Sequence, residues 1–404
     1  MQSLSLGLSE ALRLTLAGMP PLAAVELPLL EALSQAAAGD HQALVDSPAR
    51  DASRKDGYAV ASHELATAAP GNPARLRVLG SLAAGGVEEI ALRPGAAVRV
   101  LTGARLPAGA DAVVAEEYTR REGDQVLIDA PVAPGFNLLP RGGDARAGRV
   151  VLTAGQVLTP LRAGLLAAAG HATARVHAAP RVGVLGTGDE LALPGQPLSE
   201  GQLHASNIVT LAALCRQFGL STRLAIARDE APALAAALTD LLAQSDALVT
   251  SGGAWQGDRD LMVKVLEGLG WEKVFHRIRI GPGKAVGFGR LEGRPVFILP
   301  GGPPSNLMGF LQIALPGLLA LAGRADPGLP RVNARLGADI GEGKVGWTDF
   351  FYGRLEPGPD LPIFYPQKKR TRLMDIAQAE AVAAIPEGRE SLAAGEVVSV
   401  QLLP

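Results

Sequence analysis

The sequence contains a single cysteine, Cys215, among its 404 residues. One thiol excludes an intrachain disulfide and leaves a cysteine-based zinc site without enough ligands. Cys215 shares a helical period with Ile208, Leu211 and Phe218, so we expect it in the core rather than acting as a nucleophile. Aromatic residues are also scarce, at 4% of the chain, which fits a protein rich in alanine, leucine, valine and glycine.

An excess of charge of one sign is missing as well. The 38 basic and 40 acidic residues give a formal net charge of −2. No overall field therefore attracts nucleic acid or a membrane surface, and we expect neither as a partner. The six histidines form no His-x-x-x-His pair, and none lies in a Gly-x-Ser-x-Gly sequence. The usual zinc-protease and serine-hydrolase motifs are thus excluded.

No apolar run has the length and flanking residues of a membrane span or a secretion signal. Glu10 and Arg13 interrupt the N-terminal segment early, and no basic region precedes an apolar one. The most apolar stretch, residues 308–323, contains Gln312 and Pro316 and is short for a span. It is typical of a buried helix pair or a kinked helix, and we expect a cytoplasmic protein.

The sequence does contain three short loops, each directly after a strongly apolar run. The loops are Thr187–Glu190, Ser251–Gly253 and Leu299–Gly302, after the runs 182–185, 247–250 and 295–299. Helical patterns lie between them, which predicts repeated strand–loop–helix units and a parallel sheet. In such sheets ligands bind at the carboxyl ends of the strands, where glycines let backbone N–H groups approach a phosphate. We therefore expect a ligand site there.

The length of the chain predicts several structural units rather than one core. Residues 3–38 have a helix-rich pattern, and helical character returns at 160–169. Short β-like runs between glycine and proline turns, over residues 76–150, predict an all-β insertion. The fold class is thus multidomain α/β plus β. The predicted units are a discontinuous helical unit (1–48 and 147–179), to which the family resemblance described below gives a role in dimerisation, an inserted β unit (49–146), an α/β unit (180–325) and a β-rich C-terminal unit (326–404).

Acidic residues lie in and beside the loops of the α/β unit. Glu190 follows one strand, and Asp260 lies just beyond the Ser251–Gly253 loop. Oxygen ligands from two neighbouring loops are what Mg²⁺ takes when it also holds phosphates and waters. Asp189 and Asp258 have a simpler interpretation, as caps of a turn and of the following helix.

Two basic features each allow two interpretations. Lys284, in the sequence Gly281-Pro282-Gly283-Lys284, is either a point charge for an anion or a solvated lysine on a turn. The run Lys368-Lys369-Arg370-Thr371-Arg372 either holds an oxyanion or is a solvated loop, because dense charge usually faces solvent. Two prolines and Tyr365 just before the run favour a positioned loop.

A second polar set lies in the predicted β unit. Its segments are Lys55–Tyr58, Thr102–Ala104 and Arg141–Asp144. Each places an acid or a hydroxyl beside a glycine, which describes an ordinary turn as well as a site. Spacing alone does not choose between the two.

Taken in order along the chain, these motifs resemble the MoeA-type molybdopterin molybdenumtransferases, relatives of the catalytic domain of gephyrin. A single motif of this kind is weak, whereas a collinear run over nearly the whole chain is specific. The matching segments are 55–60, 101–104, 106–107, 109–114, 135–137, 141–144, 187–191, Asn207, 228–229, 251–253, 257–258, Asp260, 283–284 and 288–289.

The resemblance implies an elongated homodimer of four subdomains, in which the inserted β unit of one chain faces the α/β unit of the other. It also implies the last step of molybdenum cofactor synthesis. In that step Mg²⁺ assists cleavage of adenylated molybdopterin, AMP leaves, and molybdate is inserted at the dithiolene sulfurs. The upstream adenylyltransferase and apo-molybdoenzymes are the implied protein partners.

The resemblance also implies roles for individual residues. Glu190 and Asp260 would hold Mg²⁺, directly or through water. Asp229 is a further acid in the cleft, and Lys284 would contact the nucleotide or the oxyanion. The residues that would reach the pterin from the partner chain are Asp56, Thr102 and Asp144. The other binding residues would be Ser251, Gly252, Gly253, Gly257, Pro300, Gly301, Arg370 and Arg372.

The sequence departs from the family pattern where molybdate would bind. Gly302 stands where the family has asparagine, Gly281 stands where members often carry lysine, and the basic run replaces a Gly-Ser pair. Three alternatives stay open: an active molybdenum transferase, a paralogue that inserts tungstate, and a non-catalytic dimeric scaffold that holds molybdopterin. We expect Arg370 and Arg372 to supply compensating anion contacts, because a guanidinium can bind two oxyanion oxygens at once.

Overall fold

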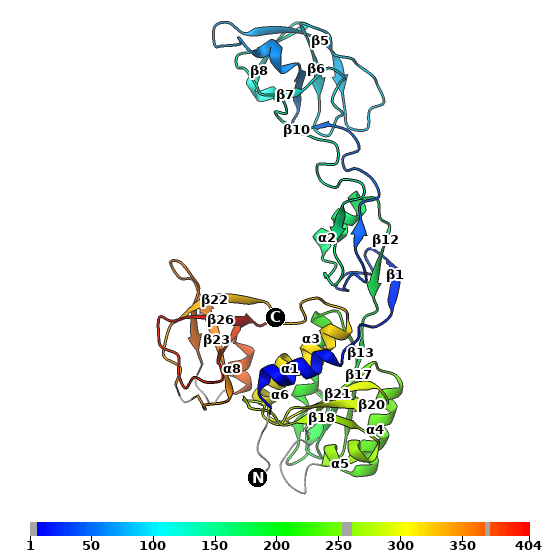
Figure 1. The fold of residues 1–404 in the computed structure, drawn as a ribbon, viewed down its shortest axis with the longest axis vertical. Helices are drawn as coiled ribbons and strands as arrows, with labels where there is room; N and C mark the ends of the chain where they lie inside the picture. Colours follow the sequence, from blue (N-terminus) through cyan, green and yellow to red (C-terminus); the bar gives the residue numbers. More distant parts are fainter. Residues whose placement is uncertain (1–5, 253–260, 342, 368–371) are drawn as a thin grey trace.

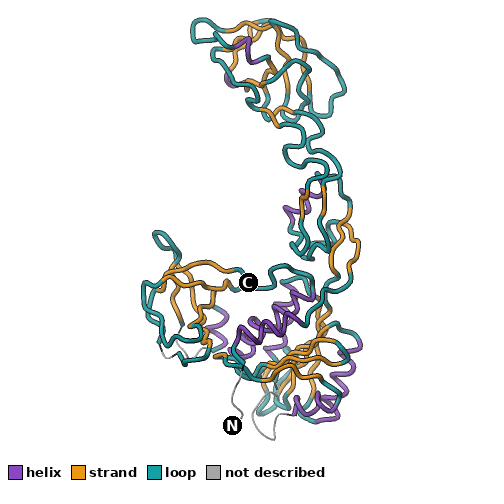
Figure 2. Tube along the Cα trace, viewed as in Figure 1, coloured by secondary structure: helices purple, strands orange, loops and turns teal. Residues whose placement is uncertain are grey.

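The computed structural model describes residues 6–252, 261–341, 343–367 and 372–404. The chain is elongated (Figure 1). A β unit occupies one end, the α/β unit and the C-terminal unit lie together at the other end, and a narrow middle unit joins the two. Helices gather in the α/β unit, whereas strands and loops dominate the far end (Figure 2).

The α/β unit is built on a six-stranded sheet in the order β16-β13-β17-β21-β20-β18. The first four strands are mutually parallel, and the last two are antiparallel to their neighbours. The predicted parallel sheet is therefore confirmed. The strands are β13 (Arg181–Thr187), β16 (Ser221–Ala227), β17 (Ala247–Ser251), β18 (Glu272–His276), β20 (Gly287–Leu291) and β21 (Arg294–Leu299).

Apolar side chains alternate between the two faces of this sheet, and helices pack against them on both faces. Val184, Val249 and Phe297 face one cluster, with α3 (Ser206–Gln217) and the long C-terminal helix of the unit. Leu185 and Leu248 face the other, with α4 (Ala231–Ala243) and α5 (Leu261–Gly268). Period-two alternation is what a sheet covered on both sides requires. Cys215 is buried in the first cluster, as expected for a core residue.

The long apolar helix of the α/β unit runs from Pro303 to Leu321 as α6 (Pro303–Gly309), a π segment (Phe310–Ala314) and α7 (Leu315–Leu321). Pro316 cannot donate to a carbonyl in the preceding turn, and the π segment ends two residues before it. The helix is long and apolar enough to cross a membrane by composition, but 83% of its apolar window is buried inside the protein. It is a core helix, as expected.

The inserted β unit is a six-stranded sheet in the order β7-β4-β6-β5-β9-β8. Tyr58 and Val60 lie in its buried cluster. The strands predicted near residues 76, 97, 112 and 125 are all present. They and their neighbours are β4 (Gly57–Val60), β5 (Ala74–Leu82), β6 (Ala96–Val100), β7 (Ala112–Ala115), β8 (Thr119–Glu122) and β9 (Gln125–Ile128).

The middle unit is made of two separate stretches of the chain. The prediction that residues 3–38 are rich in helix is wrong for most of that stretch. Among the described residues from 6 to 38, only Leu8–Ala17 forms an α-helix, α1, and it packs on α7 of the α/β unit. The following residues form β1 (Ala24–Pro28), which pairs with β12 (Thr173–His177). The pair β2 (His41–Gln42) and β11 (Val150–Leu152) and the helix α2 (Pro160–Ala168) complete the unit.

Two chain segments connect the middle unit to the β unit (Figure 1). They form an isolated antiparallel bridge between Ser47 and Ala145, in which the Ser47 N–H donates to the Ala145 carbonyl at 2.7 Å. Arg141 Nε donates to Asp46 Oδ2 at 2.5 Å across the same connection. Just beyond it, the short strands β3 (Ala52–Ser53) and β10 (Leu138–Leu139) pair with each other.

The C-terminal unit is a six-stranded sheet that includes a short strand from the α/β unit. Tyr352 belongs to the same buried cluster as the α/β helices, and Gln312 Nε2 donates to Gln401 Oε1 at 2.6 Å across the contact. The predicted fold class is thus confirmed, while the unit boundaries stay predictions. The strands are β19 (Ile280–Gly281), β22 (Arg331–Leu336), β23 (Thr348–Glu356), β24 (Ile363–Pro366), β25 (Ala381–Ile385) and β26 (Val397–Leu402), with the helix α8 (Leu373–Ala377).

Candidate functional site

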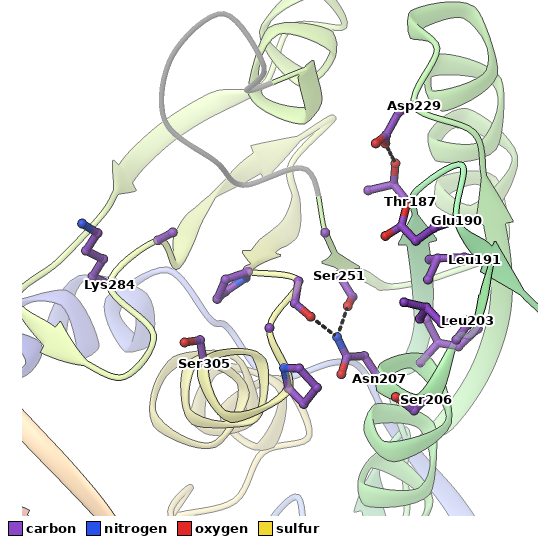
Figure 3. Close-up of a pocket in the computed structure, with 18 of the residues that line it drawn as sticks. Thr187, Glu190, Leu191, Leu203, Ser206, Asn207, Asp229, Ser251, Lys284 and Ser305 are labelled. Carbon is purple, nitrogen blue, oxygen red and sulfur yellow. Dashed lines mark hydrogen bonds between the residues drawn. The ribbon is translucent and has the colours of Figure 1, made fainter. Parts of the chain in front are cut away.

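A cavity of about 600 Å³ opens at the carboxyl ends of the parallel strands (Figure 3). The strand ends are level there, because Gly186, Ser251 and Leu299 are register partners across β13, β17 and β21. The chain leaves β13 toward β16 on one side and later returns to β17 on the other, so the cavity lies at the switch point of the sheet. Open α/β sheets bind ligands at this position.

The cavity is lined by both polar and apolar residues. Seven of the residues expected in the site line it: Glu190, Asp229, Ser251, Gly252, Lys284, Pro300 and Gly301. The other lining residues are Thr187, Leu191, Leu203, Ala205, Ser206, Asn207, Ile208, Arg277, Ala285, Gly302, Pro303 and Ser305.

The acidic wall comes from the ends of β13 and β16. The Thr187 hydroxyl donates to Asp229 Oδ1, and the Asp229 N–H donates to Asp189 Oδ1 at 3.3 Å. The Glu190 side chain folds back over Gly188. This needs glycine, because a Cβ at position 188 would lie 2.5 Å from Glu190 Oε2. Two carboxylates thus lie on one wall. The Asp189 carboxylate joins the loop after β13 to the loop after β16, which differs from the turn cap given as its simpler interpretation.

The floor of the cavity is a cluster of side-chain amides around Ser251. Asn207 Nδ2 donates to Ser251 Oγ at 3.1 Å and to the Gly301 carbonyl at 2.7 Å. Asn306 Nδ2 donates to Ser251 Oγ at 2.9 Å and to the Pro300 carbonyl at 2.9 Å. These contacts join the end of β17 and the loop after β21 to the start of α3 and to α6.

The basic wall holds Lys284 and Arg277. Lys284 lies across the cavity from Glu190 and Asp229 (Figure 3). Arg277 adopts a left-handed backbone conformation, with φ of 71°. A non-glycine residue there is strained, and such strain gathers at functional sites. Sequence reasoning missed Arg277, since nothing in the pattern around it signals a site.

Gly252 lets the loops of β13 and β17 come together. Its φ is 106°, and a Cβ at this position would lie 2.4 Å from the Thr187 carbonyl oxygen. Any side chain would push the two loops apart, so the cavity depends on glycine here.

The donor set suits Mg²⁺ held partly by a substrate. Glu190 and Asp229 offer carboxylate oxygens beside the Thr187 hydroxyl, and hard oxygen donors are what this ion prefers. Within the described ranges no cluster of three or more metal-binding side chains occurs. An ion that keeps waters and phosphate oxygens needs only one or two protein carboxylates. Three expected members, Gly253, Gly257 and Asp260, lie outside the described residues.

The second polar set lies outside the α/β unit: Asp56 and Thr102 belong to the β unit, at the far end of the chain (Figure 1), and Asp144 lies at the connection between the β unit and the middle unit. Asp56 Oδ1 accepts from the Thr102 N–H and from Thr102 Oγ1, both at 2.7 Å. These bonds lower the pKa of Asp56, the backbone one most. Asp144 is placed by its N–H, which donates to the Ser47 carbonyl at 2.9 Å. One chain alone therefore joins Asp56 with Thr102 but brings neither to the cavity.

Comparison with known proteins accounts for nearly the whole chain. Residues 6–170 match the MoeA N-terminal region (domain I and II), 183–320 a probable molybdopterin binding domain, and 334–403 the MoeA C-terminal region (domain IV). The chain is 34% identical over 382 residues to molybdopterin molybdenumtransferase 2 of Mycobacterium tuberculosis, covering 93% of this chain and 94% of the relative. The chain belongs to the MoeA-type molybdopterin molybdenumtransferase family.

Other MoeA-type proteins agree with this assignment. The molybdopterin molybdenumtransferase of Nostoc is 32% identical over 89% of this chain and 84% of its own length. The crystal structure of the molybdopterin biosynthesis MoeA protein from Pyrococcus horikoshii OT3 superimposes with a TM-score of 0.81, at 29% identity, over 98% of this chain and all of that one. This is a family of transferase enzymes, as predicted.

The departures from the MoeA pattern have a structural counterpart. A Cβ at Gly281 would lie 2.1 Å from Asp349 Oδ1, so the lysine that family members often carry there does not fit without movement of Asp349. Gly302 lines the cavity without a side chain to offer. Of the two arginines expected to compensate, Arg370 lies outside the described residues. Arg372 precedes α8, where its N–H donates to Asp375 Oδ2 at 2.8 Å, and α8 contacts α6 beside the cavity.

Proposed function

We propose that this chain is a molybdopterin molybdenumtransferase that inserts molybdate into molybdopterin. The observation that carries the proposal is the cavity at the switch point, with Glu190 and Asp229 on one wall and Lys284 and Arg277 among its other lining residues. Binding of a pyrophosphate requires basic side chains that contact its oxygens, and it requires carboxylates that hold a metal counter-ion beside them. The names of the relatives agree with this chemistry.

The substrate we propose is adenylated molybdopterin, and AMP is the leaving product. Glu190 and Asp260 would hold Mg²⁺, with Asp229 as a further acid in the cleft, and the ion would offset the phosphate charge during cleavage. Lys284 and Arg277 would hold non-bridging phosphate oxygens and orient the pyrophosphate against the acidic wall. Water would attack the pyrophosphate, so that AMP leaves while molybdopterin keeps its own phosphate, and no protein nucleophile is needed. The two dithiolene sulfurs, which this cleavage leaves unchanged, would then bind molybdate as oxygen atoms of molybdate leave as water.

The active form we propose is a homodimer with a shared cleft. The β unit, which carries Asp56 and Thr102, lies at the opposite end of the chain from the α/β unit that holds the cavity (Figure 1), so a partner's β unit would supply Asp56, Thr102 and Asp144. The middle unit has apolar side chains to bury against a second copy: Leu30 is 80% exposed, Leu44 62% and Leu161 87%. Exposed apolar side chains gathered in one small unit favour association.

The oxyanion contacts of this dimer would include Arg370 and Arg372 in place of the missing lysine and asparagine. Either molybdate or tungstate fits such contacts, because both are tetrahedral oxyanions of equal charge. We keep a cytoplasmic location, the upstream adenylyltransferase and apo-molybdoenzymes as expectations that go with the family.

The test is incubation of the purified protein with adenylated molybdopterin, Mg²⁺ and either oxyanion, following AMP release and formation of the metal-containing cofactor separately. We expect both products with molybdate. AMP release with tungstate alone would indicate the tungsten paralogue. Binding of the pterin with neither AMP release nor metal insertion would indicate the non-catalytic scaffold, which the loss of a cation at Gly281 favours.

A further inference from the structure

The hydroxyl of Ser251 accepts two hydrogen bonds from two different asparagines. Asn207 Nδ2 lies 3.1 Å and Asn306 Nδ2 lies 2.9 Å from Ser251 Oγ. A serine hydroxyl has two lone pairs and one hydrogen. Both lone pairs are therefore engaged by the protein.

The direction of these bonds is fixed by backbone carbonyls. Each amide nitrogen also lies close to a carbonyl oxygen: Asn207 Nδ2 is 2.7 Å from Gly301 O, and Asn306 Nδ2 is 2.9 Å from Pro300 O. A carbonyl only accepts, so the NH₂ end of each amide must face it. Each NH₂ group then has one hydrogen left, and Ser251 Oγ receives both.

The hydroxyl hydrogen of Ser251 has no acceptor among the described residues, and Ser251 lines the cavity. We propose that Asn306, together with Asn207, is a positioning residue that makes the Ser251 hydroxyl a donor only, aimed at an anionic oxygen of the ligand. The inference rests on the proposed function in one respect, namely that this oxygen belongs to the phosphate of an adenylated substrate.

This arrangement has consequences for the chemistry of Ser251. A hydroxyl whose lone pairs are occupied can neither attack phosphorus nor take a proton, so Ser251 binds rather than reacts. It also discriminates between ligands, because a ligand N–H in the same place would meet a donor. Asn306 is suited to hold the hydroxyl since it is only 2% exposed and water cannot compete with it.

The decisive substitution is Asn306→Asp, which keeps the shape and replaces the donor with an acceptor. Ser251 would then turn its hydrogen toward the new carboxylate and away from the ligand. We expect the affinity for AMP and for inorganic phosphate, measured by calorimetry, to fall by about tenfold or more. Asn72→Asp, the same change on an exposed turn of the β unit, should leave both affinities unaltered.

A double-mutant cycle with Ser251→Ala separates loss of the donor from repulsion of the anion by the new charge. If the hydroxyl is the donor, Asn306→Asp weakens binding much less in the Ser251→Ala background than in the wild type. If the two losses simply add, the asparagine acts through charge or general structure and the inference is wrong. Asn207→Asp, at a less buried position, gives the same cycle should Asn306→Asp fail to fold.

Failure of the inference and failure of the proposed function give different results. A wild-type protein that binds neither AMP nor inorganic phosphate overturns the donor role. A wild-type protein that binds AMP with the expected cycle but releases no AMP from adenylated molybdopterin overturns the proposed reaction and leaves the donor role standing.

Discussion

The phenol of Tyr352 donates a hydrogen bond to the carbonyl of Pro304 at 3.0 Å. Tyr352 lies on β23 of the C-terminal unit, and Pro304 lies in the first turn of α6, next to the cavity. The side chain is 2% exposed, and burial raises its pKa, so it stays a protonated donor at every physiological pH. This bond ties the C-terminal unit to the helix that forms the edge of the candidate site.

Tyr352→Phe removes that donor and keeps the ring. We expect the free energy of unfolding to fall by about 1 kcal/mol, the usual net contribution of a buried hydrogen bond. The measurement is urea denaturation followed by circular dichroism. Tyr365→Phe, at a side chain 39% exposed, is the matched control and should leave stability within about 0.5 kcal/mol of the wild type. Equal losses in both variants would contradict the role of the bond.

Arg277 has a backbone conformation that glycine adopts without strain. Arg277→Ala and Arg277→Gly both remove the side chain, so their difference reports the backbone alone. We expect the glycine variant to be more stable than the alanine variant by about 1 kcal/mol, the cost of a left-handed L-residue. Thermal unfolding measures this difference. Both variants should bind AMP more weakly than the wild type, and unaltered binding would remove Arg277 from the proposed phosphate contacts.

Glu190→Gln tests the metal role of the acidic wall. A neutral amide is a poorer ligand for a hard cation, so the Mg²⁺ concentration for half-maximal AMP release should rise by about tenfold or more. Stability should change little, because Glu190 lies on the cavity wall rather than in the core. Glu200→Gln, at an exposed residue of the same loop region, is the control. Superimposable Mg²⁺ titrations for the two variants would make Glu190 a structural residue.

Mixed dimers test the shared cleft. Asp56→Ala disables the β-unit set and Glu190→Gln disables the cavity set, so each homodimer should lose most activity. In a heterodimer of the two, one cleft collects both defects and the other collects none. Activity should therefore reappear on mixing and unfolding–refolding of the inactive proteins. If it never reappears, although wild-type chains treated in the same way regain activity, the two sets do not share a cleft.

The Asp56 carboxyl should titrate below the usual range for aspartate, because Thr102 stabilises its charged form. A folded-state pKa below the unfolded value means that this contribution to stability is present above the unfolded pKa and is lost as the pH falls through the folded pKa. Thr102→Val removes the hydroxyl and keeps the backbone N–H. We expect the pKa of Asp56, followed by carboxyl-carbon NMR, to rise only part of the way. A pKa unmoved by Thr102→Val would assign the shift to the backbone alone.

The strands and the position of the cavity can be predicted from the sequence because the patterns that indicate them are local. A buried run such as Ala247–Ser251 followed by glycines specifies both a strand and a loop at its carboxyl end. The strand at Ala24–Pro28 cannot be predicted from a local pattern. Leu27 and the leucines that flank this segment fit a helical pattern, but pairing with Thr173–His177, far along the chain, decides its conformation.

The amide cluster was also beyond sequence reasoning. The sequence places Asn207 in the motif run but does not indicate that it contacts Ser251. Asn306 is marked only by being an amide in an apolar helix. The hydrogen bonds that give them a role join residues 44 and 55 positions apart. Such contacts depend on the level ends of β13, β17 and β21, which exist only once the sheet has formed.

The two-segment connection at Ser47 and Ala145 determines how the β unit can move. A pair of antiparallel segments resists stretching and sideways shear but bends across its flat face. The β unit therefore rotates as a whole about this connection. Because Asp56 and Thr102 lie far from the connection and Asp46 lies next to it, a small rotation displaces Asp56 and Thr102 much farther than Asp46. In the proposed dimer, such a swing would change the distance between the pterin contacts of one chain and the phosphate contacts of the other, while each set keeps its internal geometry.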